Sequence, residues 1–236
     1  MVSSFRDRRV LVTGAASGIG RAIFGAFGDA GARVVGLDRV PVPDHEQDTV
    51  IVDLSEEAEI VAGIAETLRR LGGVDVLVNC AGIQIDDPIA ALDIAGMDRM
   101  YAVNLRAPIL VTREVLKGMG PGGRIVNIAS ELAYLGRAGS SGYCATKAGI
   151  LSLTRSWARE LAPGILVNAV APGPIDTPLL GFDRMDPATQ ALETENPLRR
   201  IGKADEVARA VLFLASPSTS FTTGQCISVD GGAAMH

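Results

Sequence analysis

Residues 9–30 read RVLVTGAASGIGRAIFGAFGDA, a stretch that joins a short apolar run, a glycine-rich turn and a helical pattern. The run at 9–13 is rich in branched aliphatic residues and is typical of a buried strand. After the glycines, apolar residues recur at helical spacing and form one stripe on a helix of about three turns, made of Ile19, Ala22, Ile23, Ala26, Phe27 and Ala30. The stretch therefore predicts a strand that passes through a tight turn into a helix.

The same alternation continues along the chain. Six further strand-like runs follow, at 33–38, 49–53, 74–79, 124–130, 165–171 and 225–230. A second clear helical stripe covers 60–71, with Ser55 as its expected N-cap. The runs are apolar at nearly every residue, as expected where helices cover both faces of a parallel sheet. The sequence thus predicts an α/β fold, a Rossmann-like doubly wound parallel sheet of about seven strands with helices on both faces.

Two segments depart from this alternation. Residues 39–48 read RVPVPDHEQD, and Pro41 and Pro43 leave too little room for a crossover helix between the second and third strands. Residues 176–202 hold three prolines among polar residues and are expected to form a lid over a substrate. No linker rich in proline, glycine or serine divides the chain, so we expect one domain over residues 1–236.

Charge and composition exclude several classes of protein. The 22 Lys and Arg residues against 27 Asp and Glu give a net charge of −5, the wrong sign for a surface that binds nucleic acid. No run of about 18 uncharged apolar residues predicts a membrane span, and the apolar stretch after Arg9 is too short for a signal peptide. Three separated cysteines outside any paired motif fit a reducing, cytoplasmic setting, namely Cys80, Cys144 and Cys226.

The turn at 13–20 reads TGAASGIG and has the features of an anion site. Free N–H groups and the positive end of the helix dipole face any phosphate that binds at the start of a helix. The spacing G-x-x-x-G-x-G lacks the lysine of a triphosphate-binding loop. Asp38 ends the second strand 18 residues after Gly20, where a carboxylate accepts hydrogen bonds from adenosine ribose hydroxyls and repels a 2′-phosphate. We therefore expect a dinucleotide site that prefers NAD to NADP, although Arg39 offsets part of the repulsion.

Tyr143 and Lys147 are four residues apart, and on a helix this spacing puts both side chains on one face. An ammonium about 5 Å from a phenol, at an effective dielectric constant of about 20, favours the phenolate by about 3 kcal/mol. We therefore expect Lys147 to lower the pKa of Tyr143 toward neutral pH, so that the phenol exchanges a proton with substrate. Ser130 ends the fifth predicted strand, at the sheet edge where ligands of such folds bind, and can hold the substrate oxygen.

Taken singly, these residues are equally explained as packing or surface residues, but their order along the chain is informative. Together they resemble the motifs of the short-chain dehydrogenase/reductase superfamily, in its single-domain branch, over essentially the whole chain. The matching positions are the turn at 13–20, Asp53-Leu54, Asn79-Cys80-Ala81-Gly82, Asn104, Ser130, Tyr143-x-x-x-Lys147, and Pro172-Gly173 with Thr177.

The resemblance implies a role for each matching residue. The implied catalytic residues are Asn104, Ser130, Tyr143 and Lys147, with Asn104 organising a water beside the lysine and Lys147 also binding the nicotinamide ribose. The expected contacts with NAD, which beyond the glycine turn and Asp38 rest on the resemblance, are Gly14, Ala16, Ser17, Gly18, Ile19, Gly20, Asp38, Asp53, Leu54, Asn79, Ala81, Gly82, Tyr143, Lys147, Pro172, Gly173, Ile175 and Thr177. The resemblance also implies a homotetramer, with the apolar end at 231–235 against a neighbour.

The expected activity is hydride transfer between NAD(H) and a small-molecule secondary alcohol or ketone, without a metal. A serine hydrolase or a metal enzyme is excluded because the only histidines are His45 and His236, in the 39–48 link and at the last position. Candidate substrate-pocket residues are Glu131, Tyr134, Arg137, Leu179, Leu180, Phe182 and Met185.

Two alternatives stay open. One is an NADPH-dependent 3-oxoacyl-[acyl-carrier-protein] reductase. Against it stand Asp38 and segments 118–121 and 162–164, which lack the basic residues that such reductases commonly carry near the site entrance. The other is a protein that senses a dinucleotide without catalysis.

Overall fold

Seven parallel strands form one sheet in the order β3-β2-β1-β4-β5-β6-β9 in the computed structural model, which describes residues 5–235. The strands are β1 (Arg9–Thr13), β2 (Arg33–Asp38), β3 (Thr49–Ile51), β4 (Val76–Asn79), β5 (Gly123–Ile128), β6 (Ile165–Pro172) and β9 (Cys226–Val229). Every neighbouring pair is parallel. This order confirms the predicted doubly wound sheet. His236, one of the two histidines in the sequence, lies outside the described residues.

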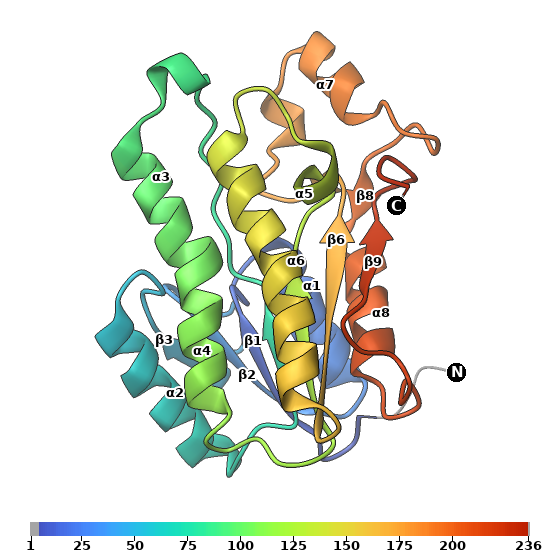
Figure 1. Ribbon diagram of the computed structural model, residues 1–236. Coiled ribbons are helices and arrows are strands. Elements are labelled where there is room, and N and C mark those ends of the chain that lie inside the picture. Colours follow the sequence, from blue (N-terminus) through green and yellow to red (C-terminus); the bar gives the residue numbers. More distant parts are fainter. Residues whose placement is uncertain (1–4, 236) are drawn as a thin grey trace.

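Helices cover both faces of the sheet, as Figure 1 shows. One face packs against α2 (Glu57–Leu71), α4 (Ala107–Val115) and α6 (Ser141–Leu161), and the other against α1 (Gly18–Asp29) and α8 (Ala204–Ala215). Within β1, Leu11 belongs to the first core and Val10 and Val12 to the second, and all three are fully buried. Alternate residues of a strand point to opposite faces, so burial of both sets explains why the strand reads as a continuous apolar run.

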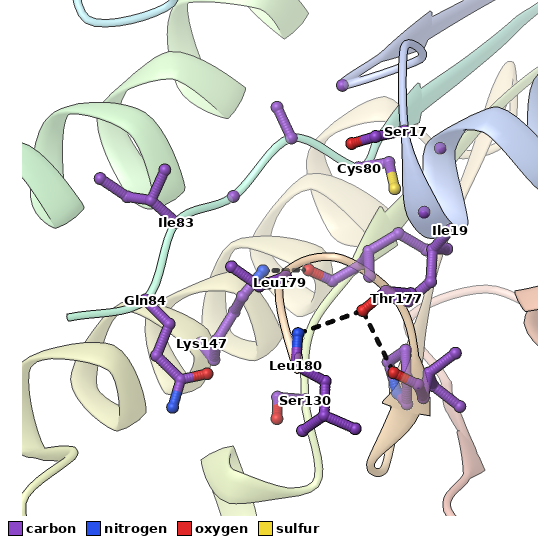
Figure 2. A pocket seen from close by; sticks show the side chains of 18 of the residues that line it. Ser17, Ile19, Cys80, Ile83, Gln84, Ser130, Lys147, Thr177, Leu179 and Leu180 are labelled. Atoms are coloured by element: carbon purple, nitrogen blue, oxygen red, sulfur yellow. Dashed lines mark hydrogen bonds between the residues drawn. The ribbon is translucent and has the colours of Figure 1, made fainter. Parts of the chain in front are cut away.

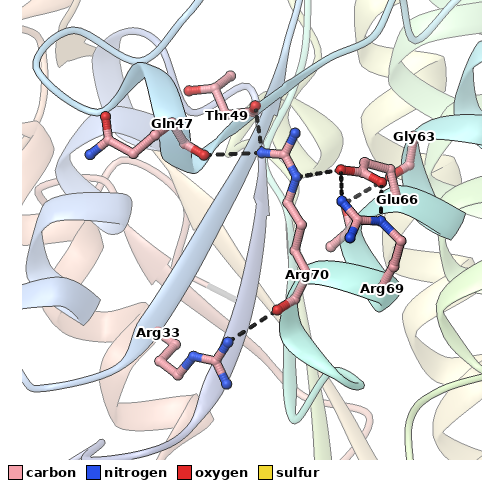
Figure 3. A network of polar contacts seen from close by, with 8 residues as sticks. Arg33, Gln47, Thr49, Gly63, Glu66, Arg69 and Arg70 are labelled. Atoms are coloured by element: carbon pink, nitrogen blue, oxygen red, sulfur yellow. Dashed lines mark hydrogen bonds and ion pairs between the residues drawn. The ribbon is translucent and has the colours of Figure 1, made fainter.

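The link between β2 and β3 contains only the short 3₁₀ helix η1 (Glu46–Asp48), which agrees with the expected irregular connection. The edge strand β3 is held instead by Arg70 of α2, whose guanidinium donates to the carbonyls of Gln47 and Thr49 at 3.0 and 3.1 Å. Figure 3 shows Glu66 orienting the same guanidinium. The three-residue strand β3 gains little stability from its hydrogen bonds to β2, so the bonds from Arg70 help to fix it in place. Asp38 lies at the end of the neighbouring strand β2, opposite Ile51 of β3.

The helix α2 begins one residue later than its predicted cap would place it. Glu56 is the N-cap and Glu57 the first helical residue. The Ser55 hydroxyl and N–H both donate to Asp53 Oδ1, at 2.7 and 2.9 Å, and form a separate turn before the helix. Ser55 was therefore wrong as the cap, because a nearer carboxylate takes its hydrogen-bonding groups.

The segment expected to form a lid projects beyond the carboxyl edge of the sheet (Figure 1). It contains η4 (Phe182–Arg184) and α7 (Pro187–Glu193), and its base is a parallel pair of two-residue strands, β7 (Ile175–Asp176) and β8 (Gly202–Lys203). This pair of strands was not predicted. The role of residues 176–202 as a lid stays a prediction.

The remaining helices also lie toward the carboxyl edge. They are η2 (Ile89–Ala91), α3 (Ile94–Tyr101) and α5 (Leu132–Leu135), and α3 continues into α4 through a π-helical segment, η3 (Ala102–Arg106). Among residues 5–235, no helix is both long enough and apolar enough to cross a membrane.

Candidate active site

One cavity lies at the carboxyl ends of the central strands and beneath the lid segment. Most of the predicted site residues line it together, namely Gly14, Ser17, Gly18, Ile19, Gly20, Asp38, Asp53, Leu54, Ala81, Gly82, Ser130, Tyr143, Lys147, Pro172, Gly173, Ile175 and Thr177. Ala16, Asn79 and Asn104 are not among its lining residues. Of the predicted pocket residues, Glu131, Arg137, Leu179 and Leu180 line the cavity, whereas Tyr134, Phe182 and Met185 do not.

The glycine-rich turn closes tightly over the end of β1. Gly14 has φ +69°, and a Cβ on it would lie 2.7 Å from Ala81 Cα. A Cβ on Gly20 would lie 1.9 Å from the Gly14 carbonyl oxygen, so only glycine fits there. Ser17 is the N-cap of α1 and makes no side-chain capping bond, which leaves the first N–H groups of the helix to face the cavity. The turn is thus shaped for a phosphate group.

Asp38 lies at the end of β2 in the wall of the cavity, beside Arg39. Its Oδ2 accepts from the Ala16 N–H at 2.9 Å and its Oδ1 accepts from the Arg39 N–H at 2.7 Å. Ala16 therefore fixes this carboxylate through its backbone although its side chain lies outside the cavity. The carboxylate is held close to the turn, as the predicted ribose contact requires.

Tyr143 and Lys147 lie on one face of α6 and line the same cavity, 8% and 4% exposed. The Lys147 Nζ donates to the Ile128 carbonyl at 2.9 Å and lies 5.7 Å from the centre of the Tyr143 ring. Figure 2 shows Lys147 and Ser130 near the lid residues Leu179 and Leu180. The predicted pair is therefore brought together at one end of the cavity.

Ser130 lies two residues beyond β5, because the strand ends at Ile128 and not at Ser130 as predicted. Its Oγ donates to Glu131 Oε2 at 3.0 Å and accepts from the Leu132 N–H at 3.1 Å. Its hydroxyl also hydrogen-bonds to that of Tyr143. The turn after β5 thus places the serine against the phenol.

Asn104 lies in the π-helical segment and is 1% exposed. Its Oδ1 accepts from the Ile83 N–H at 2.9 Å, and its Nδ2 donates to the Ile83 carbonyl at 2.8 Å and to Thr146 Oγ1 at 3.2 Å. The side chain therefore ties the chain after β4 to α6, next to Lys147. π segments are frequent at functional sites, but the implied water-organising role of Asn104 stays a prediction.

Asn79 faces away from the cavity. Its Nδ2 donates to Asn127 Oδ1 at 2.9 Å and to Thr112 Oγ1 at 3.2 Å, and Asn127 in turn donates to Thr154 of α6 at 2.9 Å. This buried network joins β4, β5, α4 and α6. The side chain of Asn79 therefore holds together the elements behind the site, and its predicted contact with the cofactor stays a prediction.

Comparison with known proteins decides the family. The family model described as enoyl-(acyl carrier protein) reductase matches residues 14–234. The chain belongs to the short-chain dehydrogenase/reductase superfamily.

Three relatives illustrate the range of this superfamily around the chain. It is 37% identical over 238 residues to a 3-oxoacyl-[acyl-carrier-protein] reductase of Thermotoga maritima, which covers 94% of this chain and 96% of the relative. It is 39% identical over 247 residues to cis-4-hydroxycyclohexanecarboxylate dehydrogenase of Sinomonas cyclohexanicum, which covers 98% of each. Among solved structures, ligand-free aldohexose dehydrogenase of Thermoplasma acidophilum matches with a TM-score of 0.93 and 35% identity, over 100% of this chain and 97% of that one.

Short-chain dehydrogenases/reductases are oxidoreductases that bind a nicotinamide cofactor and act on small molecules. The residues of this chain fit such a cofactor, because the tight glycine turn and the uncapped start of α1 can receive its pyrophosphate. The other end of the same cavity holds Ser130, Tyr143 and Lys147. The glycine-rich turn and these three side chains therefore line one cavity in this short-chain dehydrogenase/reductase.

The electrostatics of the phenol differ from the expectation. Burial raises the pKa of Tyr143 above its ordinary value, and the charge of Glu131 raises it further. Burial also lowers the pKa of Lys147 to about 8, so its ammonium is itself destabilised. The expected lowering of the Tyr143 pKa by Lys147 is therefore wrong for the protein by itself, because both groups lie out of water and desolvation outweighs their mutual attraction.

A polar cluster beside Ser130 was only partly anticipated. Arg137, in the loop after α5, donates to both carboxylate oxygens of Glu193 in α7, at 2.7 and 3.1 Å, and Glu193 is 4% exposed. Glu193 was missed because nothing in the local sequence separates it from the exposed Glu195 two residues later. The pair joins the segment at 176–202 to the loop after α5.

Glu131 is expected to make the enzyme less stable as the pH rises. Burial raises its pKa from 4.5 to about 7, so between these values the unfolded chain loses this proton first. The stabilisation is complete below about pH 4.5 and is lost by about pH 7, a change of about 3 kcal/mol. Glu131→Gln removes this titration. Urea unfolding at several pH values should therefore show the free energy of unfolding of the variant rising by about 3 kcal/mol relative to that of wild type as the pH increases across this range. A difference that is constant with pH would contradict the assignment.

Proposed function

We propose that this short-chain dehydrogenase/reductase is NAD(H)-dependent and transfers a hydride between the nicotinamide and a carbon that bears a secondary hydroxyl or a ketone. The observation that carries the proposal is one cavity with Asp38 at one end and Ser130, Tyr143 and Lys147 at the other. When bound, the nicotinamide supplies the hydride acceptor or donor. The protein supplies the proton chemistry and the orientation of the substrate oxygen.

The side chains around the reacting oxygen have distinct roles in this proposal. Tyr143 takes the alcohol proton during oxidation and returns it during reduction. Ser130, in hydrogen-bond contact with that phenol, holds the substrate oxygen as charge develops on it. Lys147, fixed by the Ile128 carbonyl, stabilises the phenolate in its ammonium form and binds the nicotinamide ribose.

Asp38 supports the preference for NAD. Its carboxylate is fixed beside the glycine turn by two backbone N–H groups, so it is ready to accept hydrogen bonds from the ribose hydroxyls. A 2′-phosphate in the same place meets a like charge at close range. Homotetramer formation stays a prediction from the resemblance.

A second candidate is an NADPH-dependent 3-oxoacyl-[acyl-carrier-protein] reductase, which Arg39 in the cavity wall favours because it can pair with a 2′-phosphate. The sequence argument against it from segments 118–121 and 162–164 was wrong. These segments lead into β5 and β6 and lie at the amino edge of the sheet, opposite the cavity. Their lack of basic residues therefore has no bearing on carrier docking.

Initial rates separate these functions. The enzyme is given linear, cyclic and polyhydric secondary alcohols with NAD or NADP, while the absorbance of the reduced cofactor is followed. We expect turnover of at least one alcohol, with kcat/KM about tenfold or more higher for NAD than for NADP. Reduction of carrier-bound 3-oxoacyl groups with NADPH alone would support the second candidate. Calorimetric binding of a dinucleotide with no turnover in either direction would indicate a sensor.

A further inference from the structure

Glu131 lies beside Ser130 in the wall of the cavity. It follows Ser130 directly in the chain, lines the cavity and is 6% exposed. Its Oε2 accepts the Ser130 hydroxyl at 3.0 Å. A serine hydroxyl has one hydrogen, so the hydrogen that would hold a substrate carbonyl oxygen is given to Glu131.

Two further hydrogen bonds involve the Ser130 hydroxyl. Ser130 Oγ accepts from the Leu132 N–H at 3.1 Å and also bonds to the Tyr143 hydroxyl. The bond to Tyr143 favours the phenolate, so Ser130 is the donor in it as well, and its single hydrogen is shared between Glu131 and the phenol. While Glu131 is ionised, the Ser130 hydrogen is therefore held inside the protein and is not presented to a ketone.

A proton on Glu131 reverses this arrangement. The protonated carboxyl becomes a donor to Ser130 Oγ, and the Ser130 hydrogen is then free to turn toward the substrate oxygen. We propose that Glu131 is a positioning residue whose protonation state decides whether Ser130 donates to the substrate or to Glu131, so that ketone reduction requires the protonated form. This inference rests on the proposed function.

Several charged and titratable groups surround Glu131 and influence its pKa. Arg137 faces it from the loop after α5, Glu193 from α7 and Tyr143 from α6, while Asp86 from the segment after β4 acts on both Tyr143 and Arg137. Arg137 donates two hydrogen bonds to Glu193, so this carboxylate already offsets much of the positive charge that Glu131 faces. Burial is the largest influence and raises the pKa of Glu131 to about 7, while Arg137 lowers it and Glu193 raises it.

The test is the pH dependence of ketone reduction in the intact enzyme. In the wild type, kcat/KM should fall about tenfold or more between about pH 6 and pH 9, as the serine donor is lost. Glu131→Gln has no proton to lose there, so its profile should lack the inflection near pH 7, and its total fall should be smaller than that of wild type by about tenfold. Lys147, with a pKa of about 8, contributes the same inflection to every variant. In the oxidation direction, Glu131→Gln should move the Tyr143 inflection to lower pH, because the carboxylate charge that raises this pKa is gone.

Glu193→Gln is the matched control, since it changes the other buried carboxylate of the cluster. Removing that charge should move the Glu131 inflection to lower pH without abolishing it. An inflection that disappears in Glu193→Gln and persists in Glu131→Gln would overturn the assignment.

A second measurement does not depend on turnover. Infrared difference spectra of the protein alone should show a protonated carboxyl band that is lost as the pH passes through about 7, is absent in Glu131→Gln and is present in Glu193→Gln. Absence of this band in the wild type overturns the inference, as does an unchanged pH profile in Glu131→Gln. Wild-type enzyme that shows the band but turns over no alcohol or ketone contradicts the proposed function, and the positioning role fails with it.

Discussion

Replacing Tyr143 with phenylalanine is expected to lower kcat/KM for alcohol oxidation by about 10³-fold or more and to leave the Kd for NAD within about threefold. The phenol oxygen is the group that exchanges the substrate proton, and general acid/base catalysis contributes about 10²–10⁴-fold. The ring itself packs with Met100 and Leu132, and phenylalanine keeps these contacts. The variant should therefore fold and bind cofactor without performing the reaction.

Tyr134→Phe is the matched control for this experiment. Tyr134 lies nine residues earlier, on α5, and does not line the cavity. Its hydroxyl bonds to Cys226, so this substitution removes a half-buried phenol of the same size outside the site. Steady-state rates and calorimetric titration with NAD should show activity within about twofold of wild type for Tyr134→Phe. If Tyr143→Phe kept more than about a tenth of the activity, Tyr143 would not be the acid/base.

The sheet was predictable from the sequence because buried parallel strands leave a strong local signal. The runs at 9–13 and 33–38 coincide with β1 and β2, and that at 165–171 matches β6 to within one residue. The pair of strands β7 and β8 was not predictable from the sequence, because two-residue strands have no periodicity and their pairing joins residues far apart in the chain.

The site was predictable where spacing along one element determines geometry. The four-residue separation of Tyr143 and Lys147 places both on one helix face, and the structure keeps that arrangement. The ion pair of Arg137 with Glu193 joins residues 56 apart in sequence, so no local pattern reveals it. The predicted direction of the Tyr143 pKa shift was wrong, because a Coulomb estimate from the spacing omits how deeply both groups are buried.

Asp38→Ala is expected to lower the ratio of kcat/KM for NAD to that for NADP by about 10³-fold. Loss of charge-assisted hydrogen bonds to the ribose costs about 1.5–3 kcal/mol with NAD, and removal of a like charge beside the 2′-phosphate favours NADP by a similar or larger amount. Arg39 lies next to the vacated position in the cavity wall and can then pair with the phosphate without competition from Asp38. Initial rates with each cofactor at saturating alcohol measure the ratio.

Two further variants show whether charge is the cause. Asp38 also accepts from the Ala16 N–H of the glycine turn, so part of any loss in Asp38→Ala comes from a looser turn. Asp38→Asn keeps an acceptor for that N–H and removes the charge, so it should retain most of the gain with NADP. Adding Arg39→Ala to Asp38→Ala should reverse the gain with NADP and leave the rate with NAD unchanged from the single variant. If Asp38→Asn behaved like wild type toward both cofactors, Asp38 would act by holding the turn, and the preference for NAD would need another source.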